Sequence, residues 1–197
     1  PTTYMVTSMN DNNGCIGTPL GSAVVTINPS LSLTLSGTNV ACYGDSNGAI
    51  DLSVAGGTAP FSYAWSGPAG YTAGVQDISG LQAGYYSVVV TDSKGCTASG
   101  NITITQPVQL TLSSTGNIAL LCNGATTGAG SFTAAGGTAP YTFNIVADNT
   151  GATLTTAATS ASFTGAGAGT LTVRVTDAHN CTAESTVTEA EVAAVVR

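Results

Sequence analysis

Residues 56–65 read GGTAPFSYAW, and residues 136–145 read GGTAPYTFNI. In both copies a Gly-Gly pair marks a turn, and every second residue after the proline is aromatic or aliphatic. Alternation with a period of two is typical of a β-strand, because successive side chains point to opposite faces. The copies start 80 residues apart, at residues 56 and 136, so they predict equivalent strands of a repeated β-fold.

Other markers recur at a similar spacing. CYG at residues 42–44 corresponds to CNG at residues 122–124, and VVVTD at residues 88–92 corresponds to VRVTD at residues 173–177. Because these markers are independent of the Gly-Gly turns, they predict a tandem repeat with a period of about 80 residues.

The first residues fit the end of such a repeat. Residues 4–8 and Cys15 align with the VVVTD strand and the cysteine that follows it. The sequence therefore predicts that residues 1–28 are the C-terminal part of a truncated repeat. Two complete repeats are expected to follow, at residues 29–106 and 107–197.

Turn signals divide each repeat into about seven short alternating segments, which favours an immunoglobulin-like β-sandwich. Residues 184–196 could also form a helix, but by repeat register they should begin as the last strand. The predicted fold class is all-β, with tandem immunoglobulin-like sandwiches arranged as an extended rod.

Composition limits the possible functions. Hydrophobic residues make up 43% of the chain and charged residues only 7%, with three Lys and Arg in all and a net charge of −7. A nucleic-acid site needs clustered basic residues, so nucleic acid is excluded as a partner. No apolar run approaches the roughly 20 residues that span a bilayer, so no membrane insertion is expected in this segment.

The five cysteines follow the repeat. Each full repeat has one cysteine before its first Gly-rich strand and one after its Val-rich strand. This predicts the disulfides Cys42–Cys96 and Cys122–Cys181, with the partner of Cys15 outside this chain segment. Each bond would close a loop of about 55 residues and stabilise its domain by roughly 4 kcal/mol. Disulfides also imply an oxidising, extracellular location.

Four stretches together resemble a known family: CYGDSNGAI at 42–50, GGTAPFSYAWS at 56–66, GLQAGYYSVVVTD at 80–92 and KGCT at 94–97. They are similar to the SprB-type repeat of large surface and gliding adhesins of Bacteroidota, which is related to PKD-like modules. The resemblance covers residues 29–106 well and residues 107–197 less closely. It implies an immunoglobulin-like fold, a place on the cell surface, and a role in adhesion, gliding or filaments.

No constellation of catalytic, cofactor-binding or metal-ligating residues is visible, so the chain is predicted not to be an enzyme and to need no cofactor. His179 is the one histidine, and it occupies a predicted hairpin turn. The DNNG sequence at residues 11–14 could suggest calcium, but it lacks the spacing of a calcium loop and is ordinary turn chemistry.

Aromatic residues offer the remaining candidate contacts. Phe61, Tyr63 and Trp65 share one strand face, and the second copy repeats that face with Tyr141, Phe143 and Ile145. A face that both copies share is expected to pack in the core. Tyr71 and Tyr85 lack counterparts in the second repeat, so they are the predicted ligand contacts, with surface glycans as the ligand class.

The sequence thus favours a structural or adhesive segment of a large bacterial surface protein or filament, acting as a disulfide-locked stalk. Its expected partners are neighbouring repeats or copies of itself, and surface glycans. Two alternatives remain. The chain could be a pilin-like subunit that self-assembles by strand complementation, with Cys15 bridging subunits, or it could be a glycan-binding module.

Overall fold

The computed structural model describes residues 2–4, 9–10, 12–17, 23–25, 29–115 and 128–189. Within these ranges all regular structure is β-strand, apart from one 3₁₀ turn, η1, at Pro68–Gly70. The predicted all-β class is therefore confirmed. In the described part of the chain, no helix is long and apolar enough to cross a membrane.

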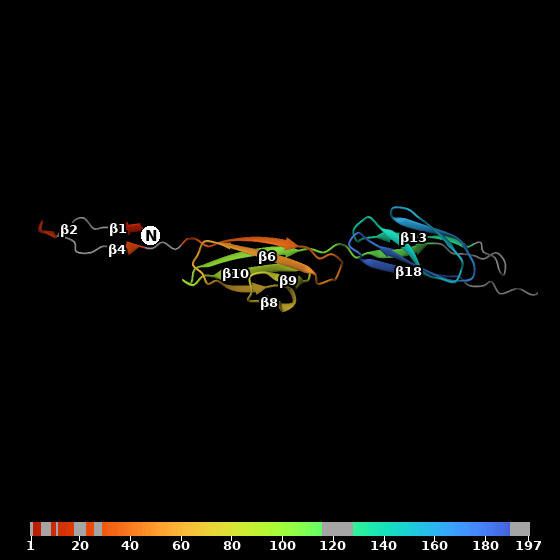
Figure 1. Ribbon diagram of the computed structural model, residues 1–197, viewed down its shortest axis with the longest axis horizontal. Coiled ribbons are helices and arrows are strands. Elements are labelled where there is room, and N and C mark those ends of the chain that lie inside the picture. Colours follow the sequence, from red (N-terminus) through yellow and green to blue (C-terminus); the bar gives the residue numbers. More distant parts are fainter. Residues whose placement is uncertain are drawn as a thin grey trace, which may run out of the picture.

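The first sandwich is formed by strands β5 to β11, between Ser32 and Ile104, and has two antiparallel sheets, with strand orders β5-β6-β9 and β11-β10-β7-β8. Figure 1 draws it in orange to green. Its seven strands are β5 (Ser32–Thr38), β6 (Gly48–Ala55), β7 (Ser62–Ser66), β8 (Thr72–Ala73), β9 (Ile78–Leu81), β10 (Gly84–Thr91) and β11 (Thr97–Ile104).

The second sandwich is formed by strands β12 to β18, between Thr111 and Glu189, and its sheets have the orders β12-β13-β16-β15 and β14-β17-β18. It follows the first sandwich along the horizontal axis of Figure 1. Its seven strands are β12 (Thr111–Thr115), β13 (Gly128–Ala135), β14 (Thr142–Asp148), β15 (Thr153–Thr156), β16 (Ser160–Ala166), β17 (Gly169–Thr176) and β18 (Thr182–Glu189). Strand β18 confirms that the helix-tolerant stretch begins as a strand.

Four short strands precede the first sandwich. Strand β1 (Thr2–Tyr4) pairs with β4 (Ala23–Val25), and β2 (Met9–Asn10) pairs with β3 (Ile16–Gly17). The β2–β3 hairpin pairs Met9 with Gly17, and the β10–β11 hairpin pairs Val90 with Ala98 in the same register. That residues 1–28 are the end of a truncated repeat stays a prediction.

The first sandwich has two distinct ends. At the end nearer the second sandwich, the Val40 N–H donates to the Thr105 carbonyl at 2.9 Å, which places the β5–β6 loop beside the exit of β11. We call this the junction end. At the opposite end, the Gly57 N–H donates to the Pro29 carbonyl at 3.0 Å, and the Ser93 N–H donates to the Thr58 carbonyl at 2.9 Å. We call this the far end.

Each sandwich has its own core. In the first, alternate residues of β6 and β10 point inward and are almost fully buried. Trp65 of β7 is buried with them and donates its indole N–H to the Val75 carbonyl at 2.9 Å. Phe61 and Tyr63 pack against this cluster, which confirms that the aromatic strand face packs in the core. In the second, the rings of Phe132 and Phe163 lie 5.6 Å apart at the centre.

The two sandwiches differ in the sheet to which one short strand belongs. Strand β8 pairs with β7 in the first sandwich, whereas β15 pairs with β16 on the opposite sheet of the second. Strand β14 therefore lies at the edge of its sheet among the described strands, and its pairing with β17 has a bulge between Ile145 and Ala147.

This difference corrects one expectation. Ile145 was expected to pack in the core as Trp65 does, but Ile145 is 39% exposed and Trp65 only 2%. The prediction is wrong because β14 lacks the neighbouring strand that helps to cover Trp65, and because the bulge turns the strand at that point.

The Gly-Gly turns require glycine for a steric reason. Gly56 has φ 74° and Gly136 has φ 73°, the left-handed region that side chains disfavour. A Cβ atom on Gly56 would collide with the Ser30 carbonyl oxygen, and one on Gly136 would collide with the Gln109 carbonyl oxygen. These turns therefore bring the start of each sandwich against the loop before β7 or β14.

Candidate functional site

One buried carboxylate organises the hairpin between β17 and β18. Asp177 is 5% exposed, and its carboxylate accepts hydrogen bonds from the backbone N–H groups of Thr138, His179 and Cys181, each at 2.9 Å. Asn180 completes the turn with φ 66°. The hairpin is thus fixed to the Gly-Gly turn, and the backbone position of Cys181 is fixed with it.

The first sandwich has the same arrangement at its far end. Asp92 is also 5% exposed, and it accepts hydrogen bonds from the backbone N–H groups of Thr58, Lys94 and Cys96, each at 2.9 Å. Gly95, with φ 81°, takes the place of Asn180. Cys96 and Cys181 therefore occupy equivalent positions in the two sandwiches.

The hydrogen bonds change the acidity of Asp177. Burial raises the pKa of its carboxyl group, but the N–H groups of Thr138, Cys181 and His179, together with the charge of His179, outweigh burial. The net result is a pKa below the ordinary value of 3.8. Ionised Asp177 therefore stabilises the folded hairpin.

We expect Asp177→Asn to lower the free energy of unfolding of the second sandwich by about 2–3 kcal/mol near neutral pH, because charge-assisted hydrogen bonds are lost. The pKa of Asp177 is lower in the folded chain than in the unfolded chain. Its contribution to stability is therefore fully present above the unfolded pKa and is lost as the pH falls through the folded pKa. Below about pH 4 the difference between wild type and variant should therefore shrink. Denaturant unfolding between pH 7 and pH 2.5 measures this. A constant difference over that range would contradict the role of the carboxylate.

The loop between β5 and β6 is fixed at the junction end by side chains. The Asn39 carboxamide oxygen accepts the Thr105 N–H at 2.9 Å, and the Gln106 carboxamide oxygen accepts the Gly44 N–H at 2.8 Å. Both contacts tie the loop to the chain that leads into the second sandwich. Cys42 lies between them.

A disulfide joins Cys42 to Cys181, so it crosses from the first sandwich to the second. The two Cα atoms are 5.6 Å apart, and the bond closes a loop with a sequence separation of 139. A hollow of about 330 Å³ surrounds it, lined by residues from both sandwiches: Tyr43, Asp45, Gln109, Leu110, Asn180 and Thr182. The candidate functional site is therefore the junction itself.

This bond corrects the predicted pairings Cys42–Cys96 and Cys122–Cys181. Cys42 lies at the junction end, whereas Cys96 lies at the far end, and the eight residues of β11 between the two ends span about 25 Å. Bonded cysteines need Cα atoms within about 7 Å of each other. Cys181 is bonded to Cys42, and Cys122 lies outside the described residues. The external partner of Cys15 stays a prediction.

The two tyrosines predicted to contact a ligand are placed differently. Tyr85 is 58% exposed on β10, whereas Tyr71 is half-buried and packs edge-on against Tyr86, with 5.6 Å between ring centroids. Tyr85 and Tyr86 are adjacent on one strand, so their side chains point to opposite faces. Tyr71 lines a hollow of about 280 Å³ that also includes Tyr86, Pro68 and Gln82. Tyr85 is not part of that lining.

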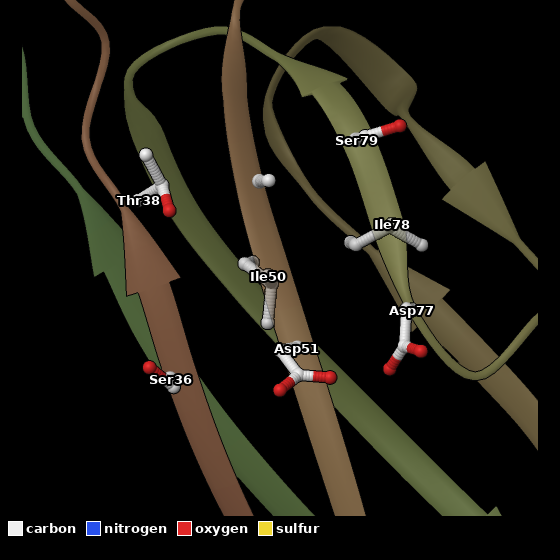
Figure 2. Close-up of a pocket in the computed structure, with 8 residues that line it drawn as sticks. Ser36, Thr38, Ile50, Asp51, Asp77, Ile78 and Ser79 are labelled. Carbon is white, nitrogen blue, oxygen red and sulfur yellow. The ribbon is translucent and has the colours of Figure 1, made fainter.

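Sequence reasoning did not single out a groove of about 390 Å³ beside β5, β6 and β9. Figure 2 shows Asp51 and Asp77 near each other there, with Ser36, Thr38 and Ser79 on the neighbouring strands. The Asp77 carboxylate accepts the Leu52 N–H of β6 at 2.9 Å. It thereby satisfies a backbone group of β6 next to the residue at which β9 begins. The residues come from three separate strands, and no local motif signals the groove.

The described part of the chain contains no group of three or more His, Cys, Asp or Glu side chains that could hold a metal ion. Asp11, in the DNNG sequence considered for calcium, lies outside the described residues. His179 lies in the β17–β18 turn, as predicted, between the end of β17 and Cys181.

Comparison with known families identifies part of the first sandwich. The family model of the SprB repeat matches residues 34–70, from β5 to η1. The chain therefore carries a SprB repeat in this region, and the resemblance seen in the sequence is confirmed. No curated protein matches the sequence.

Two solved structures are similar to the chain. One is a C-terminal 282-residue fragment of intimin in complex with the intimin-binding domain of Tir, at 18% identity and a TM-score of 0.42, covering 80% of this chain and 64% of that one. The other is the N-terminal eight Ig domains of DSCAM isoform 1.30.30, at 14% identity and a TM-score of 0.44, covering 88% of this chain and 26% of that one. The chain thus spans less than two thirds of either structure.

Proposed function

We propose that this chain is a structural and adhesive segment of a bacterial cell-surface protein. In this proposal, residues 1–28, 29–106 and 107–197 belong to successive immunoglobulin-like repeats with a period of about 80 residues, arranged as an extended rod. The observation that carries it is the Cys42–Cys181 disulfide across the junction. The SprB repeat at residues 34–70 supports the assignment to a surface protein.

The disulfide would give the junction its stiffness. Domains joined by a single linker usually move relative to each other unless a large interface holds them. Here the chain passes from Thr105 to Leu110, and the Cys42–Cys181 bond adds a second connection beside it. Two connections at one end of a sandwich restrict bending and twisting more than one does. A stalk that holds an adhesive tip away from the cell needs this property.

The same bond would redirect mechanical load. Tension applied between Pro29 and Glu189 would run along β5 to Cys42, cross the disulfide to Cys181, and leave along β18. Residues 43–180 lie outside this path. The strands that form most of both cores would therefore carry no direct tension while the bond is intact.

Location and partners follow from this role. A disulfide persists in an oxidising compartment, which agrees with an extracellular position. The role is non-catalytic, and the partners at the junction are neighbouring repeats. Glycan binding at Tyr71 or Tyr85 stays a prediction, with the hollow beside Tyr71 as the place to look first. Assembly of copies by strand complementation also stays a prediction.

Residual dipolar couplings of backbone amides test the proposed stiffness. In the oxidised chain, couplings from the first and second sandwiches are expected to fit one common alignment tensor, because the two sandwiches reorient together. In Cys42→Ser/Cys181→Ser each sandwich should need a tensor of its own. Cys96→Ser is a matched control, since it removes a sulfur from an equivalent hairpin without touching the bond.

Two results would contradict the proposal. Separate tensors in the oxidised wild type would show that the disulfide does not immobilise the junction. A common tensor retained in the double serine variant would show that stiffness comes from the linker and the noncovalent contacts alone.

A further inference from the structure

The hollow around the Cys42–Cys181 bond, which we call the junction hollow, has a neighbour. A second hollow of about 220 Å³ is lined by Gly44, Gln82, Ala83 and Gln106. Tyr43 and Asp45 line both hollows. These two side chains of the β5–β6 loop therefore lie where the two hollows meet.

Tyr43 has no part in either core. It is 53% exposed and belongs to neither cluster of buried residues. At the positions 80 residues later, the second repeat has Asn123 and Ala125 in place of Tyr43 and Asp45. The fold therefore requires neither an aromatic ring nor a carboxylate in this loop, which points to a role for both groups other than folding.

The side chains around Tyr43 suit the hydroxyl groups of a sugar. Gln109 and Asn180 line the junction hollow, and Gln82 lines the second hollow. A carboxamide donates and accepts hydrogen bonds, as a sugar hydroxyl does, and a carboxylate accepts them. The exposed tyrosine ring offers an apolar surface on which the C–H face of a sugar can pack. An aromatic ring with a few convergent polar groups is the usual composition of a small-molecule site.

Charge narrows the class of ligand. None of the described residues that line the two hollows is Lys, Arg or His. Asp45 adds a negative charge, and the whole chain has a net charge of −7. This field repels phosphate, sulfate and uronic acid groups. The chemistry of the site therefore favours a neutral oligosaccharide.

We propose that Tyr43 and Asp45 of the first sandwich, together with Gln109 and Asn180 of the second, bind a neutral oligosaccharide at the junction. One sugar ring packs on Tyr43, and its hydroxyl groups form hydrogen bonds with the polar side chains. This inference rests on the proposed function and extends it, because it gives the adhesive role a site and a ligand class.

The disulfide holds the two halves of this site together. Cys42 directly precedes Tyr43, and Asn180 directly precedes Cys181, so the bond joins the neighbours of a residue from each half. Without the bond, the ligand would have to order the two sandwiches on binding, which costs affinity. Glycan binding should therefore depend on the oxidation state of the chain.

NMR titration of the oxidised chain tests the inference. The probes are short oligosaccharides of glucose, galactose, mannose and N-acetylglucosamine, with oligogalacturonate as the acidic match of the galactose series. At least one neutral series is expected to bind and to shift the amide signals around Tyr43 and Asn180. Tyr43→Ala should weaken this binding by about tenfold, because aromatic anchors carry a large share of binding energy. Cys42→Ser/Cys181→Ser should weaken it by a similar factor.

Tyr85→Ala is the matched control. Tyr85 is also exposed, at 58%, but it lines neither hollow, so its loss should leave the affinity unchanged. Failure of every neutral series to bind, or tighter binding of oligogalacturonate than of any neutral series, would overturn the inference. So would full affinity in Tyr43→Ala or in the double serine variant.

The inference and the proposed function fail on different results. If one alignment tensor fits the oxidised chain while no neutral oligosaccharide binds, only the inference fails. If the oxidised chain needs separate tensors, the proposed stiff junction fails, whatever the titration shows.

Discussion

Pulled from its two ends, the oxidised chain is expected to reach a maximum extension about 480 Å shorter than the reduced chain. The disulfide removes a segment with a sequence separation of 139 from the load path, and a fully extended chain spans about 3.5 Å per residue. Most of β5–β11 and β12–β18 should therefore produce no unfolding step until the bond is reduced.

Single-molecule force spectroscopy with handles at the two ends measures this difference. Adding a reductant, or using Cys42→Ser/Cys181→Ser, should restore the missing length and reveal the unfolding of both sandwiches. Cys96→Ser should keep the short extension of the wild type. If the oxidised wild type already shows the full length, load does not pass through the Cys42–Cys181 bond.

Phe132→Ala is expected to lower the free energy of unfolding of the second sandwich by about 3–5 kcal/mol. Phe132 is fully buried and packs against Phe163 at the centre of the core, so its loss leaves a cavity between the two sheets. The first sandwich should be unaffected, because its core is made of different residues. The result tests whether residues 29–106 and 107–197 are separate domains.

Denaturant unfolding with two probes distinguishes the sandwiches. Trp65 is the one tryptophan of the chain and lies in the first core, so its fluorescence follows that sandwich alone. Far-ultraviolet circular dichroism follows both. Ile145→Ala, at a position that is 39% exposed, is the control and should cost far less than Phe132→Ala. An equal shift of the Trp65 transition in Phe132→Ala would mean that the two sandwiches unfold as one unit.

The strands could be predicted from the sequence because their signals are local. The alternating residues around Trp65 predict a strand at that position, and Gly56 predicts a turn at its own. The structure has strand β7 at Trp65 and a positive φ at Gly56. Repetition 80 residues later strengthened the prediction for the second sandwich. The buried aspartates were not predicted, although the TD sequence four residues before a cysteine occurs at both Asp92 and Asp177.

The disulfide partner was mispredicted because cysteine spacing alone does not distinguish a bond within one sandwich from a bond between two. Strand direction does distinguish them. Cys42 follows the first strand and Cys96 precedes the last of seven strands, so in an up-and-down arrangement they lie at opposite ends. Counting strands from the turn signals would have placed Cys42 beside the following sandwich and Cys96 beside the preceding one.

The different positions of β8 and β15 could not be predicted from local signals. Both are short, and each can pair with either sheet of its sandwich. The choice depends on tertiary packing, in which Trp65 pairs with Ala73 in one case and Leu154 pairs with Phe163 in the other. The exposure of Ile145 follows from that choice, so an alternating pattern alone could not exclude it.

The Cys42–Cys181 bond also turns most of the described chain into a closed covalent ring. Cleaving the backbone once between residues 43 and 180 opens the ring but leaves the molecule in one piece. Lys94 and Arg174 both lie inside it, so a trypsin-like protease that cuts at both would release residues 95–174 only if that part also unfolds from the rest. A surface protein built this way would tolerate a single proteolytic nick anywhere between residues 43 and 180 without losing the domains that follow.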